Sequence, residues 1–120
     1  MKHTSYILVD YKNHTVEMRL SMRVFKEDNY FFAECPELQL LDQGRFPREA
    51  ADSLIDMIQA SIMEAILTNN LDKMLNHLNF KKNSIPNRKY FSRNIDPDDE
   101  LLPLNVDAAI PYSREQMATI

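Results

Sequence analysis

One stretch of the chain, residues 46–70, carries apolar side chains at the three- and four-residue steps of a helix. The positions on this stripe are Ala51, Leu54, Ile55, Ile58, Ile62, Ala65 and Ile66. Pro47 suits a first helical turn, and the pair Asn69-Asn70 suits the left-handed backbone that often ends a helix. The pattern predicts one long amphipathic helix, and we expect the remaining apolar residues to pack on it.

The residues before this helix have the patterns of strands. Apolar and polar residues alternate over residues 16–24, which is typical of a strand with one buried face. Residues 5–11, 30–34 and 38–42 are short runs of strand-forming residues, and the second of these completes a hairpin with residues 16–24. Gly44, the only glycine, stands at the turn into the helix, where we expect its backbone freedom to be needed.

The pattern weakens after the long helix. Residues 71–78 predict a short second helix, with Asn70 as its N-cap. Residues 81–103 show no sustained period and predict a loop or an extended arm, whereas residues 104–108 alternate as a last short strand would. The predicted fold class is therefore α+β: a small antiparallel sheet of three to four strands, one long helix packed across it, a short second helix and an extended C-terminal arm.

Composition and charge narrow the function classes. A chain of 120 residues that is 44% hydrophobic and 27% charged has the composition of one globular domain. The N-terminus has no apolar leader and no apolar run approaches the roughly 20 residues of a membrane span, so we expect a cytoplasmic protein that does not contact membranes.

The net charge of −4 is uneven, because residues 27–80 carry −7 and residues 81–95 carry +5. An acidic middle suits a basic protein partner, and a merely solvated face is the simpler alternative.

Three segments, taken in order, resemble the HicB-like antitoxin family. Residues 27–38 read Glu-Asp-Asn-Tyr-Phe-Phe-Ala-Glu-Cys-Pro-Glu-Leu, similar to the family's acidic turn, aromatic, alanine and Pro-Glu-Leu. Residues 43–50 read Gln-Gly-Arg-Phe-Pro-Arg-Glu-Ala, similar to its Gln-Gly-x-Thr-x-x-Glu-Ala at the helix start. Residues 70–80 resemble its short second helix, which ends in Gly-Trp or Gly-Phe. The chain departs from the family at Phe46, which replaces threonine, and at Asn79, which replaces glycine.

The resemblance implies a fold and a function. The fold would be a partial RNase H-like domain over residues 1–80, with an extra N-terminal strand, followed by a C-terminal arm over residues 81–120. The function would be that of an antitoxin in a toxin–antitoxin system, which covers a small, basic, mRNA-cleaving toxin of the HicA type. Many family members also carry a C-terminal DNA-binding module, but no pair of amphipathic helices follows residue 80, so we do not expect direct DNA binding.

Two sets of charged residues are candidate binding sites. For a basic protein partner, the candidates are Glu34, Glu37, Asp42, Asp52 and Asp56. For nucleic acid, the candidates are the basic residues interleaved with Tyr90 and Phe91, namely Lys81, Lys82, Arg88, Lys89 and Arg93. The alternative for the second set is a solvated arm that its two aromatic residues anchor to the core or to a neighbouring subunit, and the acidic balance of the chain favours this alternative.

We expect no catalytic or metal site and no cofactor. Asp10, Glu34, Glu37 and Asp42 are the carboxylates nearest the strands, and simple solvation explains them better than a metal site does. The three histidines stand apart, at no ligand spacing. Cys35, the only cysteine, has no basic residue within three positions, which favours a buried and inert thiol.

Self-association remains open beside the antitoxin hypothesis. The extra N-terminal strand and the C-terminal arm could exchange between subunits, which would give a homo-oligomer with a regulatory or structural role.

Overall fold

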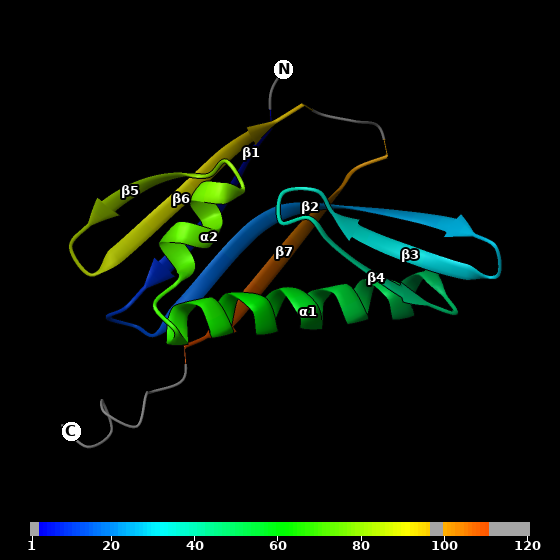
Figure 1. The fold of residues 1–120 in the computed structure, drawn as a ribbon, viewed down its shortest axis with the longest axis horizontal. Coiled ribbons are helices and arrows are strands. Elements are labelled where there is room, and N and C mark those ends of the chain that lie inside the picture. Colours follow the sequence, from blue (N-terminus) through cyan, green and yellow to red (C-terminus); the bar gives the residue numbers. More distant parts are fainter. Residues whose placement is uncertain (1–2, 97–99, 111–120) are drawn as a thin grey trace.

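The computed structural model describes residues 3–96 and 100–110 as seven strands and two helices (Figure 1). The strands are β1 (His3–Asp10), β2 (Thr15–Glu27), β3 (Tyr30–Cys35), β4 (Leu40–Gly44), β5 (Lys81–Ile85), β6 (Arg88–Ile95) and β7 (Leu102–Ala109). The helices are α1 (Pro47–Leu67) and α2 (Leu71–His77). Neither helix is long and apolar enough to cross a membrane, within the residues that the structure describes.

The seven strands form one antiparallel sheet with the order β4-β3-β2-β1-β6-β5, and β7 pairs with β2 off this path. β2 is the longest strand and pairs with three others, with β1 through Thr15–Arg19 and with β7 and β3 through successive stretches. Its residues Thr15–Met22 pair with β7, and its residues Arg23–Glu27 pair with β3. The predicted sheet of three to four strands was therefore too small, and the predicted extended arm was wrong, because β5, β6 and β7 belong to the sheet.

The physical reason lies in how β5 and β6 are stabilised. β5 is exposed at every residue, so its sequence carries no alternation for periodicity to detect. β6 is held by cross-strand pairing instead, since it pairs with β1 along its full length, from His3↔Ile95 to Asp10↔Arg88. Asn87, with a φ of 64°, turns the chain between β5 and β6. Phe91 is 1% exposed and anchors β6 in the core.

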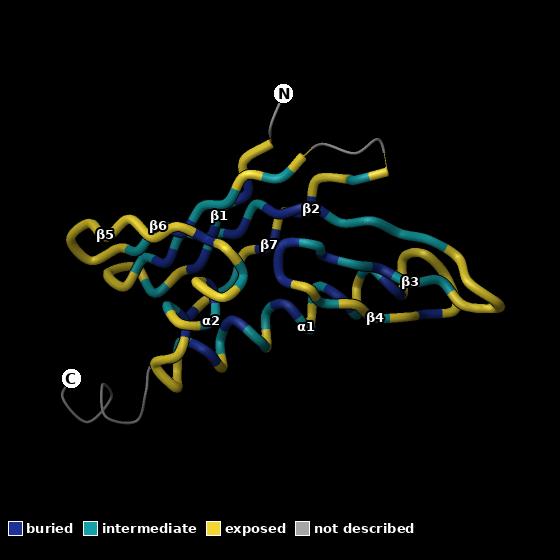
Figure 2. Tube along the Cα trace, turned by 45° about the horizontal axis from the view of Figure 1, so that its top comes forward, coloured by how far each residue is buried: buried dark blue, intermediate teal, exposed yellow. Residues whose placement is uncertain are grey.

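Both helices pack on one side of the sheet and enclose a single core (Figures 1 and 2). The long helix is confirmed: Ala50, Leu54, Ile58, Ile62 and Ala65 of α1 are buried, and Ile55 and Ile66 pack against the core at its margin. The short second helix is also confirmed, and Leu71 and Leu75 bury its inner face. On the sheet, the buried side chains include Ile7, Val9, Val16, Met18, Ala33, Phe91 and Val106.

Gly44 is required for a reason other than the predicted one. Its backbone is not left-handed. A Cβ at this position would lie 2.6 Å from the backbone nitrogen of Ala50 and 2.9 Å from Cβ of Glu49. The glycine thus permits β4 to touch the first turn of α1.

Among the described residues, the left-handed backbone positions are occupied by residues other than glycine. Asn69 (φ 56°) ends α1, as predicted, and Asn79 (φ 68°) follows α2. Asparagine tolerates this conformation better than most residues with a side chain do.

Candidate functional site

The side of the sheet opposite the helices, which we call the outer face, carries the candidate surfaces. Cross-strand partners in an antiparallel sheet point to the same side, and successive residues alternate between sides. Val24 and Ala33 pair and face the helices, so the neighbouring pair Phe25↔Phe32 faces outward. The same reasoning places the pairs Arg23↔Glu34 and Glu34↔Leu41 on the outer face.

An apolar patch lies on this face where β2, β3 and β4 form the far end of the sheet. We call it the hairpin patch, and its members are Phe25, Tyr30, Phe32 and Leu41. The rings of Phe25 and Phe32 stack, with centroids 5.5 Å apart and planes 16° from parallel. Tyr30 is 46% exposed and Leu41 is 47% exposed. Aromatic side chains grouped on an open sheet face are a feature of protein-binding surfaces.

The surroundings of the hairpin patch are predominantly acidic. Glu27 and Asp28 are exposed at the β2–β3 turn. Glu34 accepts a hydrogen bond from Arg23 Nη2 at 2.9 Å, and Arg23 Nη1 lies 3.7 Å from Glu100. Arg23 is therefore already paired with carboxylates, and the net charge around the apolar centre is negative.

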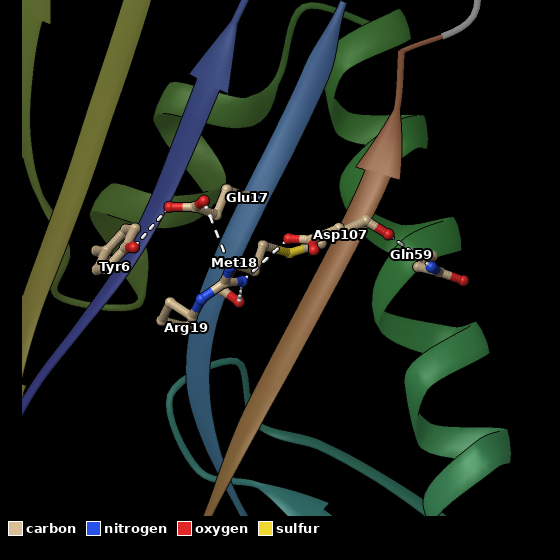
Figure 3. Close-up of polar contacts among 6 residues, drawn as sticks. All are labelled: Tyr6, Glu17, Met18, Arg19, Gln59 and Asp107. Carbon is tan, nitrogen blue, oxygen red and sulfur yellow. Dashed lines mark hydrogen bonds and ion pairs between the residues drawn. The ribbon is translucent and has the colours of Figure 1, made fainter.

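A second region of the outer face carries a polar network across β1, β2 and β7 (Figure 3). Tyr6 Oη donates to Glu17 Oε2 at 2.6 Å, and Arg19 contacts Glu17 at 3.4 Å and Asp107 at 3.0 Å. The hydrogen bond to Glu17, followed by burial, raises the pKa of Tyr6. Gln59 of α1 donates to the main-chain oxygen of Asp107 at 3.0 Å, which covers part of the free edge of β7. These contacts hold three strands and α1 in place.

Glu37 lies in the interior and not on a surface. It is 0% exposed, and its carboxylate accepts hydrogen bonds from Ser5 Oγ at 2.5 Å and Ser21 Oγ at 2.7 Å. Its main-chain oxygen accepts a bond from Arg93 Nη1 at 3.1 Å, and the same nitrogen donates to the Leu78 oxygen at 3.0 Å. A buried carboxylate without hydrogen bonds would lower the stability of the fold, and the serine hydroxyls avoid this loss. Through its side-chain and main-chain bonds, Glu37 connects β1, β2, β6 and the end of α2.

Cys35 is buried beside this carboxylate, as predicted for an inert thiol. Its Sγ lies 3.8 Å from Glu37 Oε1. Burial, together with the nearby Glu37 carboxylate, raises the pKa of the Cys35 thiol to about 12. Only the thiolate is strongly nucleophilic, so this cysteine is protonated and unreactive at neutral pH.

The other four acidic candidates do not form one cluster. Glu34 lies on the outer face, whereas Asp42 pairs in register with the inward-facing Ala33. Asp52 and Asp56 are exposed on α1, and Asp52 lies 3.9 Å from Arg48. Only Glu34 borders the hairpin patch, and the two helix carboxylates form a separate acidic surface.

The five basic candidates are also divided. Asp72 of α2 binds Lys82 at 2.5 Å and Lys89 at 3.0 Å, so one carboxylate is shared by both ammonium groups and offsets one of their two charges. Arg93 bonds to the two main-chain oxygens described above. Lys81 and Arg88 are exposed. The five residues therefore do not act as one continuous basic surface.

A cavity of about 430 Å³ lies between α1, α2 and the β3–β4 connection. Leu38, Ile62, Met74, His77 and Leu78 are among its lining residues. Within residues 3–96 and 100–110, no group of three or more histidines, cysteines or carboxylates is placed to hold a metal ion.

No family model, no curated protein and no solved structure matches this chain.

Sequence reasoning missed the hairpin patch, although one signal was present. A two-residue turn at Asp28-Asn29 fixes the register of the hairpin, because it pairs Glu27 with Tyr30 and hence Phe25 with Phe32. Continuing the alternation of residues 16–24 by one position then places this aromatic pair on the outer face. No comparable signal pointed to the burial of Ser5 and Ser21, because their hydrogen-bond partner Glu37 lies 32 and 16 residues away from them in the sequence.

Proposed function

We propose that the chain is a non-enzymatic, cytoplasmic protein-binding module of the HicB type. It neutralises a small, basic, HicA-like mRNA-cleaving toxin by covering it. The observation that carries the proposal is the hairpin patch, an aromatic surface on the uncovered side of the sheet with a predominantly acidic border. The resemblance of residues 27–38, 43–50 and 70–80 to the family supplies the identity of the partner.

The chemistry of the patch suits such a partner. Phe25, Tyr30 and Phe32 provide large apolar area with little side-chain entropy to lose, and this is the usual character of the residues that dominate binding energy. Glu27, Asp28 and Glu34 at the border favour a basic surface and disfavour an acidic one. Asp52 and Asp56 on α1 add to the negative field that attracts a cationic protein over longer distances.

The test is a titration of the purified chain with a HicA-like toxin from the same genome, encoded beside this gene. Leu41→Glu should weaken binding by about a hundredfold, because it places a charge within the apolar contact, beside Glu34. Ile85→Glu is the matched control, since Ile85 is also 47% exposed and lies on β5, the strand at the opposite end of the sheet. The control should bind as the wild-type chain does.

Two results would contradict the proposal. One is the absence of binding to any such toxin, together with no rescue of growth when toxin and chain are co-expressed. The other is an equal loss of affinity for the two variants, which would show that the hairpin patch is not the contact.

A second copy of this chain is the alternative occupant of the hairpin patch, and it corresponds to a homo-oligomer with a regulatory role. Light scattering distinguishes the two cases. A monomer that stays monomeric at high concentration excludes self-association, whereas a dimer that Leu41→Glu dissociates supports it.

A further inference from the structure

The cavity of about 430 Å³ between α1, α2 and the β3–β4 connection lies on the helix side of the sheet, whereas the hairpin patch lies on the outer face. We call it the α2 cavity, because α2 and its N-cap residue supply half of its lining residues. Its volume falls within the range of sites that hold small molecules. The cavity has no part in the function proposed above.

One part of the lining is apolar and continuous with the core. Leu38 and Ile62 are buried core residues, and Leu40, Met74 and Leu78 pack against the core but retain exposed surface. An apolar wall inside a hollow of this size is the usual setting for the apolar part of a small ligand, which gains free energy by leaving water.

The rest of the lining carries hydrogen-bond donors. Asn70, Lys73 and His77 follow one another at steps of three and four residues, and all three line the cavity from the α2 side. Asn70 is the N-cap residue of α2, but its side chain makes no capping bond. None of the three side chains has a hydrogen bond or ion pair with another described residue, so each can donate to a ligand.

The charge of Lys73 has no counter-ion within the cavity. None of the ten lining residues is acidic. The neighbouring Asp72 does not line the cavity, because its carboxylate binds Lys82 and Lys89 of the β5–β6 hairpin. The cavity therefore combines an apolar wall with one ammonium group and with neutral donors beside it.

We propose that the α2 cavity binds a small molecule in which an apolar body carries a single carboxylate, as a fatty acid does. The body packs against Leu40, Met74 and Leu78, and the carboxylate pairs with the Lys73 ammonium. The His77 imidazole, which has an N–H in either protonation state, donates to the same carboxylate. A single ammonium matches the single charge of a carboxylate, whereas sites for planar bidentate recognition generally use arginine, which this lining lacks.

The experiment is an NMR titration of the ¹⁵N-labelled full chain at constant ionic strength with octanoate, 1-octanol and octylammonium. These probes share one apolar chain and differ in the charge of the head group. We expect saturable shifts at residues 38–40, 61–62 and 70–78, with octanoate binding about tenfold more tightly than octanol and octylammonium most weakly. Shifts that never saturate, or equal affinities for octanoate and octylammonium, would overturn the proposal.

Two lysine variants separate the head-group contact from general electrostatics. Lys73→Gln should weaken octanoate binding by about tenfold and leave octanol binding within about twofold, because only octanoate has a charge to lose its partner. Lys12→Gln removes the same charge from an exposed turn outside the cavity, and it should leave both affinities within about twofold.

Both lysines are exposed, so both variants should fold normally, and the NMR spectra verify this. Equal losses of octanoate affinity in the two variants would contradict a contact with Lys73. A loss of octanol affinity in Lys73→Gln as large as the loss of octanoate affinity would contradict it as well.

Discussion

At the scale of single residues, close packing and burial explain positions that sequence reasoning assigned to other roles. Gly44 was predicted to supply backbone freedom and instead supplies room, because its backbone touches the first turn of α1. Glu37 was predicted to face a partner and instead holds the interior together through Ser5 and Ser21. The bonds of Glu37 join residues 32 and 16 positions apart, so no pattern of neighbours could reveal them.

Gly44→Ala should destabilise the chain by about 1–3 kcal/mol, because a methyl group 2.6 Å from a backbone nitrogen forces β4 away from α1. Gln43→Ala is the control, since Gln43 is exposed on the same strand, and it should change the free energy of unfolding by less than about 0.5 kcal/mol. Urea denaturation measures both values. Equal stability of Gly44→Ala and wild type would show that the close contact is absent.

The Cys35 thiol should resist alkylation in the folded chain at pH 8. Its pKa of about 12 leaves almost no thiolate at that pH, and burial blocks access by the reagent. Iodoacetamide labelling followed by mass spectrometry measures the rate with and without denaturant. Native labelling as fast as that of the unfolded chain would contradict the buried placement of Cys35.

At the scale of elements, amphipathic patterns predicted α1, α2 and the β2–β3 hairpin because each of these elements has one buried side. β5 and β6 were not predicted, because neither strand has a regularly buried side: β5 is exposed throughout and β6 has few buried positions. Pairing with β1 holds β6 in place, and this pairing joins residues 78 to 92 positions apart in sequence, from Asp10↔Arg88 to His3↔Ile95. The ion pairs of Asp72 with Lys82 and Lys89 then attach α2 to the β5–β6 hairpin.

Phe46→Thr should stabilise α1 by about 1 kcal/mol. Phe46 is the N-cap residue, it makes no side-chain capping bond, and its side chain is 65% exposed, so a hydroxyl would gain a bond at little cost in burial. Phe46→Ala is the control, because it removes the ring without adding a cap. Thermal and urea denaturation compare the three chains, and a threonine variant no more stable than the alanine variant would contradict the N-cap assignment.

Asp72→Asn should reduce stability most at neutral pH. The hydrogen bond from Lys82 lowers the pKa of Asp72 and burial opposes this, while Lys89 lowers it further, so the folded pKa lies below the ordinary value of 3.8. The stabilisation is therefore present above pH 3.8 and is lost as the pH falls through the lowered folded pKa. Because Asp72 is 41% exposed, each pair should contribute less than about 1 kcal/mol. Denaturation of both chains from pH 7 to about pH 2 tests this. If the difference in free energy of unfolding between the wild type and Asp72→Asn did not shrink below pH 3.8, the ion pairs assigned to Asp72 would be contradicted.

At the scale of the whole molecule, a two-layer arrangement leaves one side of the sheet open. Both helices cover the inner side, and the outer face presents the hairpin patch at one end while the β5–β6 hairpin lies at the other (Figure 1). Because β6 pairs with β1 and β7 pairs with β2, the strands before residue 80 depend on strands that follow it. Removing the residues after 80 should therefore affect folding of the whole sheet.

A chain that ends at residue 80 should not fold cooperatively. It would lose the buried side chains of Phe91, Leu104 and Val106, and it would expose edges of β1 and β2. Circular dichroism with thermal melting measures the outcome. A sharp transition like that of the full chain would show that β5–β7 are dispensable for folding.

The central claim is that the outer face of the β2–β3–β4 hairpin receives a basic protein partner. Hydrogen–deuterium exchange of the complex with a HicA-like toxin, compared with the free chain, tests it most directly. Our account predicts new protection of backbone amides in residues 23–34 and 40–44, with residues 88–95 unchanged. Protection confined to the exposed side of α1 around Asp52 and Asp56, with none in the hairpin, would contradict it.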